Sequence, residues 1–284
     1  MGIELLQQYI DHEFSANSAI VQHIDVFKIF KFKSVAPESE AAPSNSQEQT
    51  TTNAIGSSSG DDRVETAPAG NVAPRYEQVV PNSVNKLVVD VDDSLYFLCG
   101  GKQFDWICGG EWPSLLSWLQ LFRDACFNAR ILPVPVFGGA LVSDGERLRN
   151  WFRDQLRTAY RVRQIYRCVE DGRSPFVRGL WCAPLGTQLA IRTAFRSLCV
   201  WSAATVRDHP LELVSYAHVL DAFALVGAPS RYTAFGPLRI FSGDLRLTGL
   251  WQMFADELLV DRLTQQLHLS PLQLIILASL LGLC

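Results

Sequence analysis

From residue 86 onward, short apolar runs alternate with stretches of helical periodicity. The apolar runs lie at 86–91, 131–137, 198–202 and 222–226, and they predict strands. The helical stretches lie at 112–128, 145–169, 187–197, 211–220, 251–267 and 271–281. Continuously apolar strands that alternate with helices form a mostly parallel sheet covered on both faces. The sequence therefore predicts an α/β fold, in which the prolines of 131–137 favour an edge position or an irregular start for that strand.

Residues 36–80 interrupt this pattern. Pro, Ser, Gln, Thr, Asn, Gly and Ala dominate there, and seven acids against two arginines give the segment a net charge of −5. Few of its side chains can pack against a core and offset the entropy lost on ordering. We expect a disordered insert within one domain that spans 1–284, with the first 35 residues packed on the part after the insert.

Cellular location is constrained by two negative features of the sequence. A secretory signal is not recognisable at the N-terminus, and the longest mostly apolar run, 272–284, is too short to span a bilayer. The seven cysteines are widely spaced, with no CxxC pair and no Cys/His cluster of zinc-binding spacing. We therefore expect reduced thiols in a cytoplasmic or nuclear protein that does not contact a membrane.

Three carboxylates lie at the end of the first predicted strand, at Asp90, Asp92 and Asp93. Ligands of parallel α/β sheets bind beyond the carboxyl ends of the strands, and clustered carboxylates there are typical of magnesium-dependent phosphodiesterases. The other strand ends contribute only Asp208, whereas Arg231 follows the last strand. The alternative is that Asp92 or Asp93 caps the next turn. A complete cation site is not assembled, so Asp90, Asp92 and Asp208 are interpreted as its remnants.

The helix predicted at 145–169 carries arginines at four-residue spacing: Arg149, Arg153, Arg157 and Arg161. This spacing places them in one stripe, where neighbouring like charges repel by a few tenths of a kcal/mol per pair. Nucleic-acid phosphates would offset that repulsion, and the interleaved Trp151, Tyr160 and Tyr166 could stack on bases. The alternative is a solvated basic face with its aromatic residues in the core.

Several motifs together resemble a known family. They are VDVDDSL at 89–95, DWICGGEW at 105–112, FGGAL at 137–141, and DH at 208–209 with Glu212. With the opening MGI and the LLG at 280–282, they resemble the flap-endonuclease-like (XPG-like, PIN-like) domain of the constitutive coactivator of PPAR-gamma family. The Trp-x-x-Gly-Gly-x-Trp pattern at 106–112 is the most specific of them, although by itself it also fits a structural elbow that packs both rings.

The resemblance implies a PIN-like fold and allows its acidic positions to be compared with those of active nucleases. Asp90 and Asp208 are kept, which makes two positions of seven. The other five carry Gly138, Pro210, Pro229, Arg231 and Cys284. We therefore expect a degenerate nuclease domain with no catalytic residue and no bound metal or other cofactor. By comparison with the family, the domain is expected to be incomplete at its C-terminus.

These observations predict a non-catalytic scaffold that binds RNA through the arginine stripe. The family resemblance adds nuclear-receptor-related or signalling proteins as partners. Two alternatives stay open: a residual magnesium-dependent, structure-specific nuclease, which requires Asp90, and a module that binds proteins only.

Overall fold

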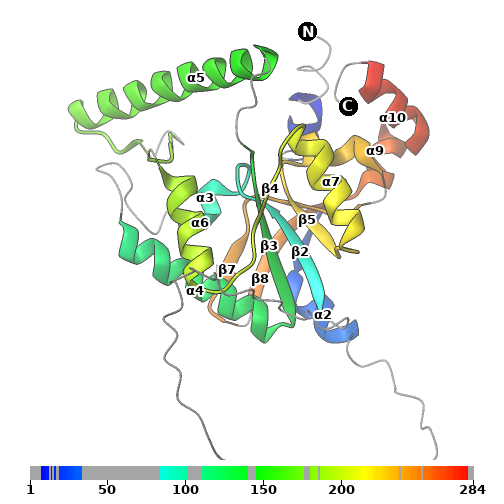
Figure 1. Cartoon of the computed structure of the whole chain (residues 1–284). Coiled ribbons are helices and arrows are strands. Elements are labelled where there is room, and N and C mark those ends of the chain that lie inside the picture. The colour runs from blue at the N-terminus through cyan, green and yellow to red at the C-terminus, as the bar shows by residue number, and fades with distance from the viewer. Residues whose placement is uncertain are drawn as a thin grey trace, which may run out of the picture.

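The computed structural model describes residues 8–12, 14, 16, 19–33, 84–101, 111–139, 145–175, 180–184, 186–236, 238–250 and 252–280. Eight strands form one sheet in the order β1-β8-β6-β5-β2-β3-β4, with β7 paired to β8 (Figure 1). The strands are β1 (Val21–Asp25), β2 (Asn85–Asp90), β3 (Ile131–Phe137), β4 (Ala203–Ala204), β5 (Ala224–Gly227), β6 (Ile240–Ser242), β7 (Arg246–Thr248) and β8 (Gln252–Leu258).

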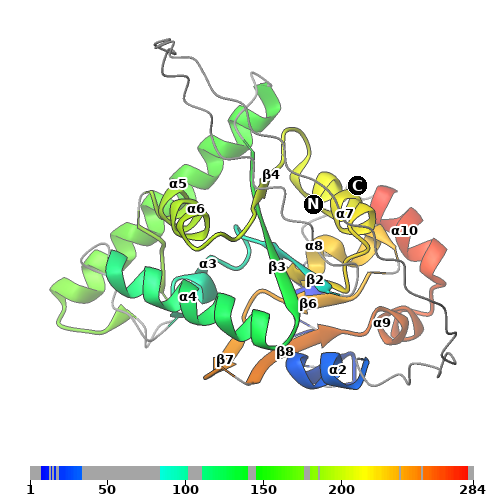
Figure 2. The ribbon, with the colours of Figure 1, turned by 60° about the horizontal axis from the view of Figure 1, so that its bottom comes forward.

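Helices flank this sheet on both faces (Figure 2). They are α2 (Val26–Lys33), α3 (Leu95–Leu98), α4 (Trp112–Asn128), α5 (Gly145–Glu170), α6 (Thr187–Ser197), α7 (His209–Val219), α8 (Pro229–Tyr232), α9 (Val260–Gln266) and α10 (Pro271–Leu280). Strands β6, β5, β2, β3 and β4 are parallel, while β1, β7 and β8 pair antiparallel. The predicted α/β class with a central, mostly parallel sheet flanked by helices is confirmed.

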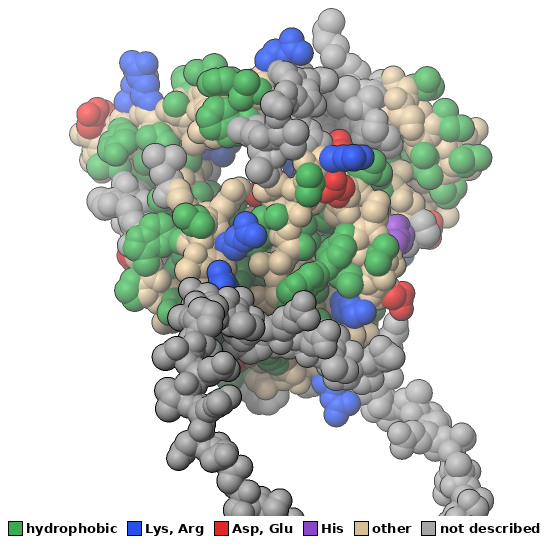
Figure 3. Space-filling view, viewed as in Figure 1, with side chains coloured by type: hydrophobic (Ala, Val, Ile, Leu, Met, Phe, Trp, Pro, Cys, Tyr) green, Lys and Arg blue, Asp and Glu red, His purple; other side chains and the backbone are tan. Residues whose placement is uncertain are grey.

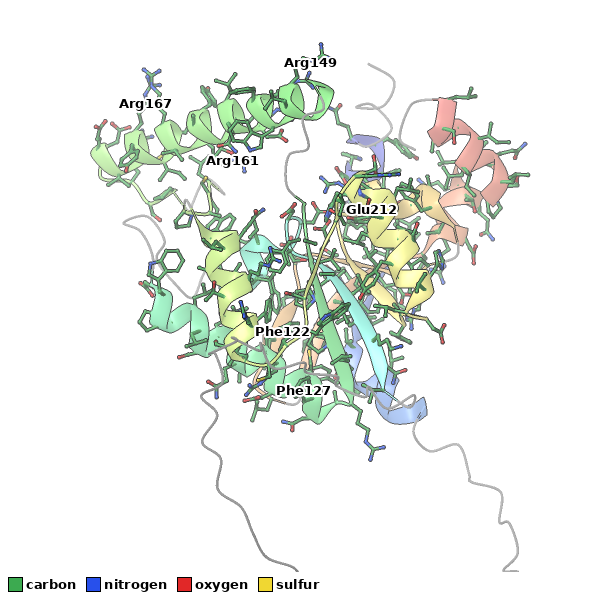
Figure 4. All side chains as sticks on the ribbon, in the orientation of Figure 1. Phe122, Phe127, Arg149, Arg161, Arg167 and Glu212 are labelled. Atoms are coloured by element: carbon green, nitrogen blue, oxygen red, sulfur yellow. The ribbon has the colours of Figure 1, made fainter. Side chains whose placement is uncertain are left out.

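Alternation along β2 sends its side chains to two separate cores. Leu87 and Val89 pack with α4 and α6 on one face, and Val88 packs with α7 on the other. Helix α4 covers the sheet face that carries Leu87 and Val89. Its Phe122 points into the core and its Phe127 points outward (Figure 4). Asp90, the last residue of β2, follows the register of Val88 and therefore lies on the α7 face.

The two prolines of β3, Pro133 and Pro135, lie at positions where the sheet needs no amide hydrogen from them. Their ring nitrogens face the side of β3 on which β4 pairs, since the Phe137 carbonyl bonds the Thr205 amide on that side. Strand β4 is short and pairs only with Val136 and Phe137. Pro133 and Pro135 therefore remove no ladder hydrogen bond, which confirms the predicted edge character along this part of β3.

The sequence misplaces the elements near the C-terminus. Residues 251–267 were expected to form a helix, but β8 and the shorter α9 occupy them. The burial of β8 alternates with a period of two, and its buried Glu257 is paired with Arg239. A charged residue at a buried strand position conceals that period in the sequence.

Other boundaries differ less. The strand expected at 198–202 is β4 at Ala203–Ala204, since a turn at Leu198–Cys199 comes first, and β1, β6 and β7 were not predicted. The packing of the N-terminal segment on the later chain is confirmed, because β1 pairs with β8. Ser270 caps α10 in a reciprocal pair with Gln273.

Some expectations fall outside the described residues. These are the insert at 36–80, most of the tryptophan motif at 105–112, and the last positions 281–284. Within the described ranges, no helix is both long enough and apolar enough to cross a membrane.

Candidate functional site

A cluster of buried and half-buried charged side chains lies at the carboxyl end of β2. Asp90 ends this central strand and is fully buried. The adjacent parallel strands β3 and β5 end at the same edge, so the residues that follow them meet Asp90. Gly138 follows β3, Arg231 and Tyr232 belong to α8 after β5, and His209 begins α7.

Five groups surround the Asp90 carboxylate. Its Oδ1 accepts from the backbone amides of Asp92 at 3.0 Å and Asp93 at 3.4 Å, and lies 3.1 Å from His209 Nε2. Its Oδ2 accepts from the Tyr232 hydroxyl and lies 3.7 Å from the Arg231 guanidinium. A carboxylate offers about four lone-pair positions, so protein groups already use the accepting capacity of Asp90.

Arg231 also holds Asp93. Its Nη1 lies 3.0 Å from Asp93 Oδ1, while the other oxygen of Asp93 accepts from the Ala228 amide at 2.9 Å. The guanidinium therefore links the carboxylates of Asp90 and Asp93. The family resemblance predicts a carboxylate at this position in an active nuclease, and this chain carries a guanidinium there instead.

Asp92 takes the space that an acidic residue at position 138 would need. Its carboxylate accepts from Gln188 of α6. A Cβ at Gly138 would lie only 2.4 Å from Asp92 Oδ2. Glycine at this position therefore lets Asp92 approach the end of β3, and an acid there would require Asp92 to move.

His209 connects Asp90 to the segment that follows β4. Its Nδ1 lies 2.9 Å from Thr205 Oγ1, and the same oxygen accepts from the Gly139 amide at 3.1 Å. With one ring nitrogen on Thr205 and the other on Asp90, the imidazole is held at both ends. We define the buried ion network as Asp90, Asp92, Asp93, His209, Arg231 and Tyr232.

The network shifts the pKa of its members in opposite directions. Burial would raise the pKa of Asp90, but hydrogen bonds from His209 and Tyr232 and the His209 charge lower it below its ordinary value. Burial would lower the pKa of His209, but Asp90 and Asp92 raise it above 6.5. Burial and the Asp90 charge raise the pKa of Asp93 to about 7, and Arg231 only partly opposes this.

Stability should consequently fall as the pH rises from mildly acidic to alkaline values. Between pH 3.8 and about 7, folded Asp93 holds a proton that the unfolded chain has released. Above pH 6.5, folded His209 likewise keeps a proton that the unfolded chain loses. Each retained proton lowers the free energy of unfolding by up to about 1.4 kcal/mol per pH unit.

Chemical denaturation at a series of pH values measures this dependence. Asp93→Asn should flatten it below pH 7, and the exposed-acid control Asp171→Asn should leave it unchanged. A wild-type stability that increases steadily from pH 5 to pH 8 would contradict the assigned proton positions.

The described residues do not fit the magnesium ions that a nuclease of this fold would use. Ligand atoms of Asp90, Asp92 and His209 do lie within 4.8 Å of one another. Magnesium, however, requires oxygen ligands in octahedral geometry, and His209 offers nitrogen. The oxygens of Asp90 are already bonded within the protein, and Arg231 adds a fixed positive charge beside them.

Asp208, predicted as a third remnant, lies outside this cluster. It is exposed at the N-cap of α7 and accepts from the Leu211 amide at 3.0 Å. Glu212, at the start of the same helix (Figure 4), accepts from the amides of Val206 and Arg207. Both acids thus fix the start of α7 and the position of His209. Sequence reasoning quoted His209 only as part of the DH motif at 208–209 and gave it no role. It missed Tyr232, whose only signal is that it adjoins Arg231.

The four arginines of the predicted stripe are all exposed on α5, which lies at the periphery of the molecule (Figures 1 and 4). Arg157 pairs with Asp154 at 3.4 Å on the surface. Trp151, Tyr160 and Tyr166 are also exposed, so the alternative that placed these aromatic residues in the core is wrong.

Comparison with known proteins places these observations in context. No protein-family model matches the chain. Its chain path is similar to that of a nuclease core: the solved catalytic core of Rad2 in complex with DNA substrate matches with a TM-score of 0.42 and 16% identity, covering 70% of this chain and 55% of that one.

In sequence, the chain is similar to a family of coactivators. It is 28% identical over 215 residues to the constitutive coactivator of PPAR-gamma-like protein 1 of Bos taurus, covering 75% of this chain. It is 26% identical over 212 residues to the constitutive coactivator of peroxisome proliferator-activated receptor gamma of Mus musculus. These similarities confirm the predicted resemblance. The matched region covers 19% of the first relative and 26% of the second.

Proposed function

We propose that this chain is a non-catalytic scaffold that binds RNA through the arginine stripe of α5. The observation that carries the proposal is the exposure of Arg149, Arg153, Arg157 and Arg161 together with the neighbouring aromatic rings. Helix α5 has seven arginines against three acids, a net charge of +4, although the chain as a whole is at −4. Such a concentration of positive charge supports phosphate binding.

The absence of catalysis rests on the buried ion network. Phosphodiester cleavage by a metal-dependent nuclease needs carboxylates that are free to hold hydrated cations. Here Asp90 is bonded to His209 and Tyr232, and Arg231 lies beside it. The chain would hold an RNA strand without cutting it.

A scaffold role also agrees with the coactivator names of the relatives. By that similarity, partners would include nuclear-receptor-related or signalling proteins, in the nucleus or the cytoplasm. No cofactor is needed for such a role.

The RNA proposal predicts a change in salt dependence. Single-stranded RNA binding should weaken as salt increases, with a slope of about −0.7 per neutralised phosphate on logarithmic axes. Replacing Arg149, Arg153, Arg157 and Arg161 with alanine should reduce the magnitude of that slope by about 3. Fluorescence anisotropy with a labelled RNA measures both affinity and slope.

A matched control removes four exposed arginines from elsewhere: Arg173, Arg196, Arg207 and Arg246. This variant keeps the overall loss of charge but spares α5, so most of the slope should remain. If the two quadruple variants behave alike, RNA does not bind at α5. Magnesium-dependent cleavage of the RNA, lost in Asp90→Asn, would favour the nuclease alternative.

A further inference from the structure

A second stripe on α5 consists of apolar side chains. Leu148, Phe152, Leu156 and Tyr160 follow one another at four-residue spacing and are 43%, 54%, 72% and 64% exposed. Residues four apart on a helix are neighbours, so these four form a continuous apolar stripe. Figure 3 shows hydrophobic side chains along α5 between arginines at its two ends. Exposed contiguous apolar surface on a charged helix is typical of a docking site.

The apolar stripe and the arginine stripe run side by side. Each apolar residue of the set directly precedes an arginine of the other, as in Phe152–Arg153 and Leu156–Arg157. Trp151 packs edge-on against Phe152 with ring centroids 5.0 Å apart, which restricts the Phe152 ring. Arg163 lies two helical turns after Leu156 and on nearly the same side of α5. A charged residue therefore borders the apolar stripe, which stays narrow.

The charge of α5 and the width of its apolar stripe distinguish among possible binding partners. RNA would use the arginines and the aromatic rings, but the leucines cannot stack on bases. A second copy of α5 would bring two helices of net charge +4 together. A lipid surface is best matched by a wide apolar face, whereas this stripe is narrow and bordered by charge. A helical partner with a narrow apolar stripe and acids beside it matches both features.

We propose that α5 docks an acidic amphipathic helix of a partner protein. The partner would place apolar residues at three- to four-residue spacing against Leu148, Phe152 and Leu156. Its carboxylates would lie beside Arg153 and Arg157. All the basic residues of α5 are arginines, whose planar guanidinium groups bind carboxylates in bidentate fashion. This inference rests on the proposed scaffold role, and it does not require RNA binding.

A synthetic peptide of about the length of α5 tests the inference with the full chain. The probe is a fluorescent helical peptide with leucines along one stripe and glutamates beside it. Controls are the same peptide with lysines in place of glutamates, and with serines in place of leucines. The chain should bind only the acidic, leucine-containing peptide, measured by fluorescence anisotropy.

The variant Leu148→Ser/Leu156→Ser removes both leucines of the apolar stripe and keeps every arginine and every aromatic ring. It should weaken peptide binding about tenfold or more and leave RNA affinity within about twofold of wild type. Leu189→Ser on α6 is the matched control, since Leu189 is equally apolar and 69% exposed. Circular dichroism checks that each variant folds.

The outcomes separate this inference from the proposed RNA function. Loss of peptide binding with retained RNA binding supports the docking site. Equal binding of the lysine peptide, no peptide binding, or binding of the same stripe to phosphatidylserine vesicles in place of the peptide overturns it. Peptide binding without any RNA binding would retain the docking site and overturn only the RNA proposal.

Discussion

Replacing the buried Asp90 with asparagine is expected to lower the free energy of unfolding by about 3–5 kcal/mol. Asparagine keeps the shape of the side chain but removes the charge that His209 and Arg231 face. The two cationic groups would then remain partly buried without their shared counterion. The Tyr232 hydroxyl would also face an amide that can donate where the carboxylate only accepts.

Chemical denaturation of the full chain measures this loss. Asp208→Asn is the matched control, because asparagine caps helices about as well as aspartate and Asp208 is exposed. The Asp90→Asn loss should be the same with magnesium and with a chelator. Stabilisation of the wild type by magnesium that disappears in Asp90→Asn would identify Asp90 as a metal ligand and contradict the closed network.

Most elements that build the sheet centre could be predicted from sequence alone. The bounds of β3, α4 and α6 are those that the apolar periodicity gives. These segments are long or continuously apolar, so burial and propensity agree. Strands β6 and β7 have three residues each, too few to show a period, and β1 and β8 carry charged residues. Their strand structure depends on mutual pairing across distant parts of the chain.

The site could be predicted only in part. Asp90 ends a recognisable strand and Asp92 follows it, so both lie at the edge of the sheet where the parallel strands end. The family resemblance also implied that Arg231 occupies a position that is acidic in active nucleases, but not that its guanidinium holds two carboxylates. The roles of His209 and Tyr232 depend on where α7 and α8 dock, which local periodicity does not encode.

The exposure of α5 could not be predicted either. Its periodicity separates arginines from apolar residues and suggests a helix with one face in the core. The structure instead leaves Phe152, Leu156 and Tyr160 largely exposed. Whether an amphipathic helix packs on its own domain depends on the position of its ends, and α5 lies at the periphery of the molecule (Figure 1).

Replacing Gly139 with alanine should be still more disruptive than the loss of the Asp90 charge. A Cβ at this position would lie 1.4 Å from the carbonyl oxygen of Thr205 and 2.5 Å from its carbon. Both are backbone atoms of the segment after β4, so no side-chain rotation relieves the overlap. The two chain segments must separate. This breaks the hydrogen bond from the Gly139 amide to Thr205 and moves Thr205 away from His209. We expect a loss of at least about 4 kcal/mol in the free energy of unfolding.

Gly138→Ala is the matched control one residue earlier. Its Cβ would meet Asp92 Oδ2 at 2.4 Å, but that atom is the end of a side chain that can rotate away. This change should cost about 1 kcal/mol, and it should disturb Asp92 while leaving the Thr205–His209 contact in place. Denaturation gives both free energies, and the imidazole NMR signals of His209 report whether that contact survives. If Gly139→Ala is as stable as the wild type, or if Gly138→Ala is the more damaging change, then β3 and β4 do not approach each other as described. The inference that the segment after β4 holds His209 through Thr205 would then be wrong.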